Sequence, residues 1–554
     1  MRFPRAVRAA SGVASLGLMR SSAPSPRAPA RARIALRVLQ LGALLVVLAA
    51  LPYKQFDLDR FFVPKELVLH AAALLAALVL LVQARRLSLA RVDQFLASFL
   101  AIGVVSALFA TNWWLAERAV AVSLSGAACF WAARAVARAG LGRRLAAVLA
   151  LAAVVGAITA LLQAYGVRTE YVSLNRAPGG TFGNRNFMAH LGVIAAPALV
   201  LVALTAPTRN SFARWSAGIG LVAAALFLSR SRAAWLALIA CAVLALPLGT
   251  MALRGAGAGL RWSRALLLVL AAAAGIGAAL VLPNTLDWTS DSPYLDTAKS
   301  VVNYKGGSGH GRLVQYGNTL RMSSHHPLLG VGPGNWPVVY PKFASRDDPS
   351  LASDGMTANP WPSSDWMTFL SERGLLAFVL LGLALVSLVA DGLRGLGSER
   401  APEDRLAAAA LLGTIVVLLV VGSFDAVLLL PVNALIAWSL LGALSPAGRE
   451  RVAVELPAAK RAGALVIVLV LGAVAIGRSF TQASAMGVFS SSTRASVLEG
   501  ASTLDPGSYR IHVRLAAAYV RRGSCTKAKP HARAAKALFP NAAEPKALLA
   551  ACAK

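Results

Sequence analysis

Acidic residues are scarce in this chain of 554 residues. Lys and Arg number 55 against 24 Asp and Glu, the formal net charge is +31, and only 14% of residues are charged. Nucleic-acid binding is the first function that such a charge suggests. The basic residues, however, gather between apolar runs, as they do in the cytoplasmic loops of membrane proteins. We therefore predict no nucleic-acid partner and expect anionic lipid to attract these loops.

Cysteine is also rare, with four in the chain. Cys129 and Cys241 lie in apolar runs, whereas Cys525 and Cys552 lie in the polar C-terminal region. No pair has the CxxC spacing of zinc ligands and no HExxH motif is present, so the sequence predicts neither a metal nor a cofactor. If the C-terminal region faces an oxidising compartment, Cys525 and Cys552 are candidates for a disulfide.

Long apolar runs, by contrast, fill most of the chain: 57% of residues are hydrophobic and the mean hydropathy is +0.63. Runs of about 20 residues match the thickness of the hydrocarbon core, and their recurrence predicts an all-α, polytopic membrane protein of about 12–13 spanning helices. The predicted spans are 34–52, 66–82, 92–110, 115–137, 144–166, 187–206, 214–229, 233–252, 263–282, 366–390, 405–423, 431–446 and 461–478.

The distribution of basic residues predicts the orientation of these spans. Arginine-rich connections fall on one side throughout, which makes the N-terminus cytoplasmic, and an odd number of spans places the C-terminus outside. We divide the chain into a basic, disordered tail at 1–33, a membrane domain at 34–478 and a helical domain at 479–554. Met19 is an alternative start to Met1.

The C-terminal domain shows helical patterns near 492–503, 509–522, 527–538 and 543–553, separated by glycine and proline. Paired helices with a period of about 34 residues are typical of tetratricopeptide repeats. A generic helical hairpin domain explains the pattern equally well. Helical-repeat surfaces commonly bind peptides or proteins, so we expect a protein partner here.

Polar sequence interrupts the apolar pattern in three places on the outer side. These are RAPGGTFGNRNFMAH from Arg176, LSRSRAAWLAL around Arg232, and the long loop 283–365. The loop contains Arg312 and His326 in GRLVQYGNTLRMSSHHPLLGVGPGNW and closes with PSSDW at Asp365. Irregular polar backbone at membrane depth lines a cavity or leaves the bilayer, and guanidinium groups suit phosphate oxygens. An anion-binding cavity is expected.

These motifs, with SSDWMTFLSERGLL and FDAVLLLPVNAL in the same order, make residues 170–445 resemble the O-antigen ligase family, which includes O-antigen polymerases. The resemblance implies a helical bundle with a large periplasmic loop in the bacterial inner membrane. It also implies a metal-independent glycosyltransferase of lipopolysaccharide biosynthesis. Such an enzyme moves a glycan from an undecaprenyl diphosphate carrier to the hydroxyl of a lipid or glycan acceptor in the cell envelope.

By this resemblance, Arg232 and Arg312 bind the diphosphate, Arg176 is a weaker third, and His326 serves loop architecture or acceptor contact. The chain departs from the family where ligases carry a histidine, because Ser363 occupies that position. A serine is no general base at neutral pH. Either Asp365 or a loop histidine such as His326 takes that role, or activation comes mainly from stabilisation of the leaving group, or the chain is not an active ligase.

Two other functions remain open at the level of sequence. The first is a transporter of lipid-linked glycan, although the chain shows no internal repeat of the kind common in transporters. The second is an inactive scaffold of envelope assembly that acts through its C-terminal domain, and the missing histidine supports it.

Overall fold

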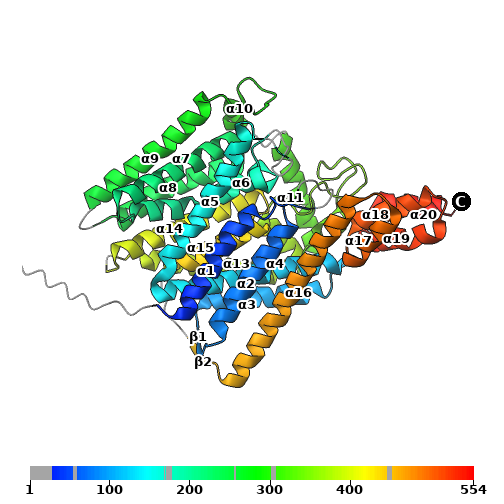
Figure 1. Ribbon diagram of the computed structural model, residues 1–554, viewed down its shortest axis with the longest axis horizontal. Helices are drawn as coiled ribbons and strands as arrows, with labels where there is room; N and C mark the ends of the chain where they lie inside the picture. Colours follow the sequence, from blue (N-terminus) through cyan, green and yellow to red (C-terminus); the bar gives the residue numbers. More distant parts are fainter. Residues whose placement is uncertain are drawn as a thin grey trace, which may run out of the picture.

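The computed structural model describes residues 28–53, 59–167, 169, 177–254, 258–300, 307–397, 399–445 and 452–553. Across these residues the chain is almost entirely helical, as the sequence predicts. Figure 1 shows the helices as an elongated bundle with a smaller group of helices projecting from one end.

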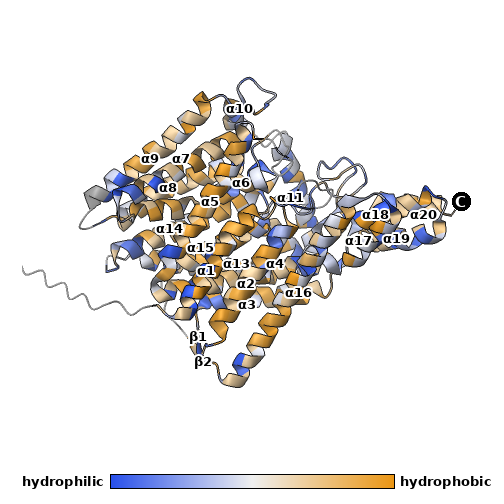
Figure 2. Cartoon of the chain, in the orientation of Figure 1, coloured by the Kyte–Doolittle hydropathy of each residue, from blue (hydrophilic) through white to orange (hydrophobic). Residues whose placement is uncertain are grey.

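The bundle contains the helices α1 (Ala30–Leu48), α2 (Val63–Leu81), α3 (Arg91–Ala107), α4 (Trp113–Val136), α5 (Gly142–Ala164), α6 (Arg185–Leu204), α7 (Arg209–Ser229), α8 (Arg232–Ala252), α9 (Ala258–Val281), α13 (Asp365–Gly395), α14 (Pro402–Phe424), α15 (Pro431–Leu444) and α16 (Ala458–Ser491). Each of the thirteen predicted spans falls on one of these helices. Orange, apolar ribbon covers most of their length in Figure 2.

Nine segments of the described chain are long and apolar enough to cross a membrane. This number is smaller than the prediction for identifiable reasons. The segment Trp113–Ala164 is counted once but contains α4 and α5, which meet at a short π-helix, η1 (Ala137–Leu141), with Gly140 at φ 75°. The helices α1, α3 and α15 do not enter the count, and α3 and α15 have only 17 and 14 residues.

Small residues bring the bundle helices close together. A Cβ at Gly442 of α15 would lie 2.3 Å from the carbonyl oxygen of Phe130 on α4, and one at Gly126 would lie 2.6 Å from the Trp438 ring. Close backbone approach of this kind is how helices associate where lipid supplies no hydrophobic driving force.

The only strands among the described residues are β1 (Arg86–Leu89) and β2 (Val452–Glu455), which pair antiparallel. They join the connection after α2 to the connection before α16, and Arg86 reaches Glu455 at 3.2 Å. This two-stranded sheet lies at the end of the bundle opposite the long loop (Figure 1).

The long loop is largely helical. It contains α10 (Pro293–Ser300), α11 (Gly307–His325), α12 (Trp336–Val339) and the 3₁₀ turn η3 (Tyr340–Lys342), and another 3₁₀ turn, η2 (Gly180–Phe182), precedes α6. The glycine-rich stretch after α11 docks into a kink of α13 at Gly374, where φ is 79° and a Cβ would lie 2.0 Å from the Leu328 oxygen. We call the end of the bundle that carries this loop the loop end.

The C-terminal helices α17 (Ala495–Leu504), α18 (Tyr509–Val520), α19 (Cys525–Leu538) and α20 (Ala543–Ala551) follow α16 at the loop end. They match the four predicted helical patterns. The helix α16, however, continues to Ser491 across the boundary that we predicted at 478/479, because the sequence there contains no proline and its glycines, Gly477 and Gly487, are tolerated within the helix.

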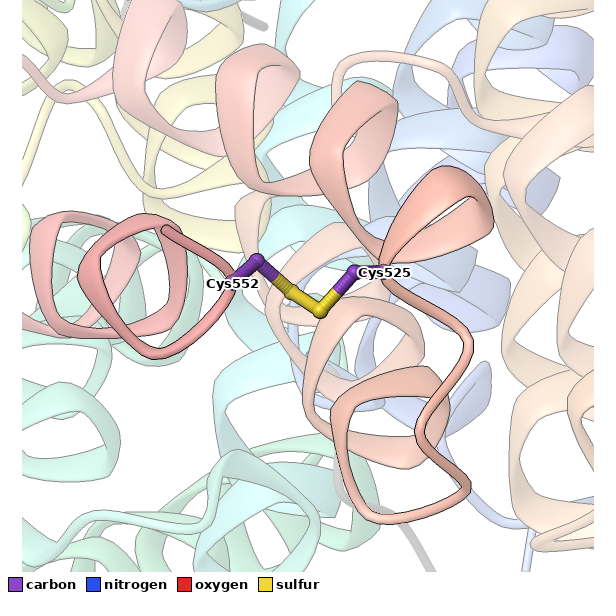
Figure 3. Close-up of a disulfide and its surroundings, with 2 residues drawn as sticks. All are labelled: Cys525 and Cys552. Carbon is purple, nitrogen blue, oxygen red and sulfur yellow. A yellow bond between two sulfur atoms is a disulfide. The ribbon is translucent and has the colours of Figure 1, made fainter. Parts of the chain in front are cut away.

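The C-terminal helices are fixed to the bundle and the loop by hydrogen bonds. Asn112 donates to the Leu538 oxygen at 3.1 Å, Asn541 to the Val338 oxygen at 3.0 Å, and the Ala543 amide to the Asp354 oxygen at 3.1 Å. Cys525 and Cys552, the pair singled out from the sequence, form a disulfide between the start of α19 and the end of α20 (Figure 3).

Candidate functional site

The break between α7 and α8 positions Arg232 at the loop end. Arg230 adopts the left-handed conformation, with φ 52°, and so ends α7, while Arg232 begins α8. The Arg232 guanidinium donates to the Ser300 oxygen at 2.9 Å and to the hydroxyl of Ser308. These contacts direct Arg232 into the loop, as the sequence predicts for a polar cavity, and not toward lipid.

Arg312 lies one helical turn after Ser308 on α11, a rise of about 6 Å. Its side chain is half-buried, and its Nε is buried without a hydrogen-bond partner. Arg312 interacts electrostatically with Arg232, with His190 of α6 and with Asp425 beyond α14. Two predicted diphosphate ligands, which are 80 positions apart in the sequence, are therefore neighbours in the fold.

Two further arginines extend this group. Arg185 and Arg230 lie against the Trp288 ring, at 5.3 and 4.5 Å from its centroid, and Arg185 is repelled by both Arg230 and Arg232. Among the described residues, none of the four arginines 185, 230, 232 and 312 forms an ion pair with a carboxylate. Asp296 attracts Arg230 and Asp425 attracts Arg312, both without ion-pair contact. Guanidinium groups that lie together without paired acids are suited to bind an anion. We call these four residues the arginine cluster.

Tyr316 of α11 connects the arginine cluster to the start of α13. Its hydroxyl lies 2.6 Å from the Ser363 oxygen and 2.7 Å from the Ser423 oxygen. Burial raises the pKa of Tyr316 to about 12, so the hydroxyl stays protonated and donates. Ser363, the position at which ligases carry a histidine, is thus held beside Ser423 at the end of α14. Asp425 follows Ser423 by two residues.

Asp425 is the acid best placed for chemistry here. One carboxylate oxygen accepts a hydrogen bond from the Ala426 amide at 2.9 Å, and the other has no hydrogen-bond partner within the described chain. Burial raises the pKa of Asp425 to about 6, against the lowering effects of Arg312 and of the Ala426 amide. The carboxylate is therefore mostly ionised at pH 7 and accepts a proton readily.

Asp365, our predicted base, has a different environment. It is buried, and its carboxylate accepts hydrogen bonds from the amides of Val427 and Leu428 at 2.9 to 3.1 Å. The backbone amide of Asp365 donates to the backbone carbonyl oxygen of Asp425 at 3.2 Å. Both carboxylate oxygens are occupied by backbone donors, so the structure gives Asp365 the role of holding the turn that carries Asp425.

His326, our other predicted catalytic residue, does not join the arginine cluster. It follows the last residue of α11, whereas Arg312 lies near the first, about 21 Å away along the helix axis. The His326 side chain is exposed, and its backbone closes the turn into the glycine-rich stretch through Ser323 and Gly330. This geometry fits the loop-architecture half of the prediction and not catalysis.

His190 has an environment that the sequence did not reveal. It is fully buried in α6, and neither ring nitrogen has a hydrogen-bond partner. The signal in the sequence was a histidine one and a half turns after the NRN motif, which places it on the same helix as Arg185. Arg176, the third predicted diphosphate ligand, lies outside the described residues.

A second buried polar group adjoins η2. The Lys65 amine donates to the Thr181 oxygen at 2.7 Å and lies 4.4 Å from the Phe182 ring centroid. The amide of Asn433 and the hydroxyl of Thr181 are buried there without partners. Within the described residues no group of three His, Cys, Asp or Glu side chains is arranged to hold a metal ion.

Comparison with known proteins gives one family. Residues 217–382 match a family model described as O-antigen ligase. The matched segment runs from α7 into α13 and includes Arg232, Arg312 and Ser363, but it ends before Asp425 and the C-terminal helices. The tetratricopeptide resemblance therefore stays a prediction. No curated protein matches the chain.

Proposed function

We propose that this polytopic membrane protein transfers a glycan from an undecaprenyl diphosphate carrier to an acceptor hydroxyl. The premise is the match over residues 217–382, which supports assigning the protein to the O-antigen ligase family, with a role in envelope polysaccharide synthesis. The observation that carries the proposal is the arginine cluster, in which four guanidinium groups from α6, α8, α11 and the α7–α8 break gather without paired carboxylates.

The arginines act on the leaving group. As the bond between the glycan's anomeric carbon and the diphosphate oxygen breaks, the bonding electrons move to the diphosphate. Arg232 and Arg312 stabilise that charge, and fixed donors aimed at developing charge are among the largest contributions to catalysis. Arg312 is suited to this role because its Nε still has a free donor.

Asp425 takes the proton. The acceptor's hydroxyl oxygen forms the new bond to the anomeric carbon and releases its proton to the free carboxylate oxygen of Asp425, and undecaprenyl diphosphate leaves. In this proposal Asp425 takes the role of the histidine whose position Ser363 occupies. Tyr316 holds the segment at Ser363 close to the end of α14 at Ser423. Asp365 is a positioning residue that holds the turn through Val427 and Leu428.

The basic residues and the disulfide support one orientation of the protein. Arginines 85, 86, 91, 143, 144, 394, 400 and 405 lie in connections that alternate with those of the loop end. By the positive-inside rule these connections are cytoplasmic. The loop end and the C-terminal helices then face the periplasm of the bacterial inner membrane, where a Cys525–Cys552 disulfide forms and persists.

The proposal is tested in a strain that lacks the chromosomal copy of the gene. The deletion strain is expected to accumulate lipid-linked glycan and to lose the finished envelope polymer. Wild-type protein restores the polymer, whereas Arg312→Ala does not. The control is Arg321→Ala, an exposed arginine at the far end of the same helix, which restores it fully.

Membrane levels of each variant are measured by immunoblot, so that loss of protein is separated from loss of transfer. An unchanged glycan profile in the deletion strain contradicts the proposed function. Full rescue by Arg312→Ala contradicts the assignment of the site while leaving the transfer reaction in place.

A further inference from the structure

A second cavity lies on another side of the bundle, between α2, α3, α4 and α16. Its volume is about 400 Å³, which is in the range of small-molecule sites. The helix α16 packs on α2 and α4 (Figure 1), and the cavity occupies the space left beside them. None of its lining residues belongs to the arginine cluster.

The cavity is amphipathic along its length. The helices α4 and α16 run antiparallel, so Trp113 and Glu117 at the start of α4 lie level with Arg478 and Gln482 on α16. Deeper in the bundle the wall is apolar, with Leu124 of α4 opposite Leu471 of α16. One end is therefore polar and lies at the loop end of the bundle, and the other is a hydrocarbon slot.

The slot opens to the outside of the bundle through apolar residues. Among the residues that line it, Leu108 is 78% exposed, Val474 52% and Val104 43%. These residues belong to membrane-spanning helices or their ends, so the bilayer is the medium that they face. A water-filled slot with such walls is unfavourable, because apolar cavities of this kind bind hydrocarbon and not water.

The polar end carries balanced charge. Arg118 pairs with Glu66 at 2.8 Å, and Arg478 lies 3.9 Å from Glu117 and 2.9 Å from Asp505 of the C-terminal region. Two of the lining side chains nevertheless keep a buried atom without a hydrogen-bond partner: Nε of Arg478, which lies 3.9 Å from Glu117, and Oε1 of Gln482. One is a donor and the other an acceptor, so a ligand that carries both kinds of group would satisfy them.

We propose that this cavity binds a zwitterionic phospholipid, with one acyl chain in the apolar slot and the headgroup against Arg478 and Gln482. The phosphate accepts from Arg478, and the ammonium donates to Gln482 and the neighbouring carboxylates. A polyprenyl diphosphate fits less well, because it brings two or more negative charges to a place where both arginines are already paired with acids.

The test uses the full-length protein in nanodiscs and phosphatidylethanolamine with a photoactivatable diazirine on one acyl chain. After illumination, crosslinked peptides are mapped by mass spectrometry. We expect crosslinks on the stretches of α4 and α16 that line the cavity. The crosslink yield should saturate as the probe concentration rises and should fall when unlabelled phosphatidylethanolamine competes. Labelling that never saturates contradicts the proposal, since it indicates ordinary contact with bulk lipid.

A matched pair of variants locates the site. Ala121→Trp fills the cavity from α4 and is expected to lower the crosslink yield on α16 by about tenfold. Ala101→Trp introduces the same side chain at an exposed position of α3 outside the cavity and is expected to leave the yield unchanged. Equal yields in the two variants contradict the site. Stronger competition by undecaprenyl phosphate than by phosphatidylethanolamine contradicts the assigned lipid. Neither measurement depends on glycan transfer.

Discussion

Arginine occurs in two contrasting settings at the loop end of this protein. In the arginine cluster, Arg232 and Arg312 lie near other arginines and form no ion pair with the described carboxylates. At the polar end of the second cavity, Arg118 and Arg478 each face acids. The first arrangement is electrostatically costly until an anion arrives, and the second is satisfied without one. By this contrast the arginine cluster is suited to bind an anionic ligand, whereas the paired arginines Arg118 and Arg478 contribute to the stability of the fold.

The largest expected effect comes from removing a guanidinium of the cluster. Arg312→Ala should lower the rate of glycan transfer by about 10²- to 10³-fold, the usual loss when one fixed donor to developing charge is removed. The melting temperature should not fall, because the variant removes repulsion with Arg232. Transfer is measured in proteoliposomes with lipid-linked donor. A loss of less than threefold contradicts the contrast.

Asp425 is intermediate between the two settings. It is an acid close to the arginine cluster, yet it is outside ion-pair contact with it. Asp425→Asn should lower transfer by about 10²-fold, as expected for loss of a general base. The wild-type rate should rise with pH through about 6 and then level off, because the carboxylate must be ionised to take the proton. A flat pH profile with full activity in Asp425→Asn assigns the base elsewhere.

The same variant has an opposite effect on stability. The pKa of Asp425 is raised in the folded protein, so the folded state binds the proton more tightly than the unfolded state does. Stability from this group therefore falls as the pH rises from below the unfolded pKa to above the folded one. At pH 8 Asp425→Asn should unfold at a higher temperature than wild type, and a lower one contradicts the assignment.

Breaking the paired arrangement should affect stability and not the chemistry. Glu66→Gln leaves Arg118 without its principal buried partner, at a cost of about 3 kcal/mol. Thermal unfolding in detergent measures this loss. The matched control is Asp59→Asn, which removes the weaker partner, at 3.7 Å and half exposed, and should cost much less. Equal destabilisation by the two variants contradicts this ranking.

The most local effect is expected at the disulfide, which constrains only the C-terminal helices. Replacing Cys525 and Cys552 by serine should destabilise these helices by about 3 kcal/mol and leave the bundle intact. Limited proteolysis should then cleave between α18 and α20 before it cleaves α13 or α14. Transfer activity unchanged by the double substitution would show that the arginine cluster does not depend on the C-terminal helices.

Local patterns predicted much of this structure. Hydropathy located all thirteen bundle helices, because an apolar run of fixed length needs no knowledge of its neighbours. Arg232 and Arg312 were found because helix breaks and polar loops are also local features. The pairing of Tyr316 with Ser363 and Ser423 was not predictable, since it joins segments 47 and 107 positions apart.

The predictions for His326 and Asp365 depended on the same local information. His326 is close to Arg312 in the sequence, yet a straight helix separates the two. Asp365 was chosen because it stands two residues after Ser363, but its carboxylate accepts hydrogen bonds from the turn at Val427 and Leu428. Adjacency along the chain did not give adjacency in the site. A role for Asp425 as the base was considered only when the contacts of Tyr316 with Ser363 and Ser423 were known.

The length of α16 sets a height above the membrane. Its 34 residues extend about 51 Å, whereas the hydrocarbon core is about 30 Å thick. The stretch from Arg478 to Ser491 alone accounts for about 20 Å. The length of α16 thus sets the distance between the membrane and the C-terminal helices. Adding or deleting four residues would move the C-terminal helices by about 6 Å and rotate their attachment by about 40° relative to the loop.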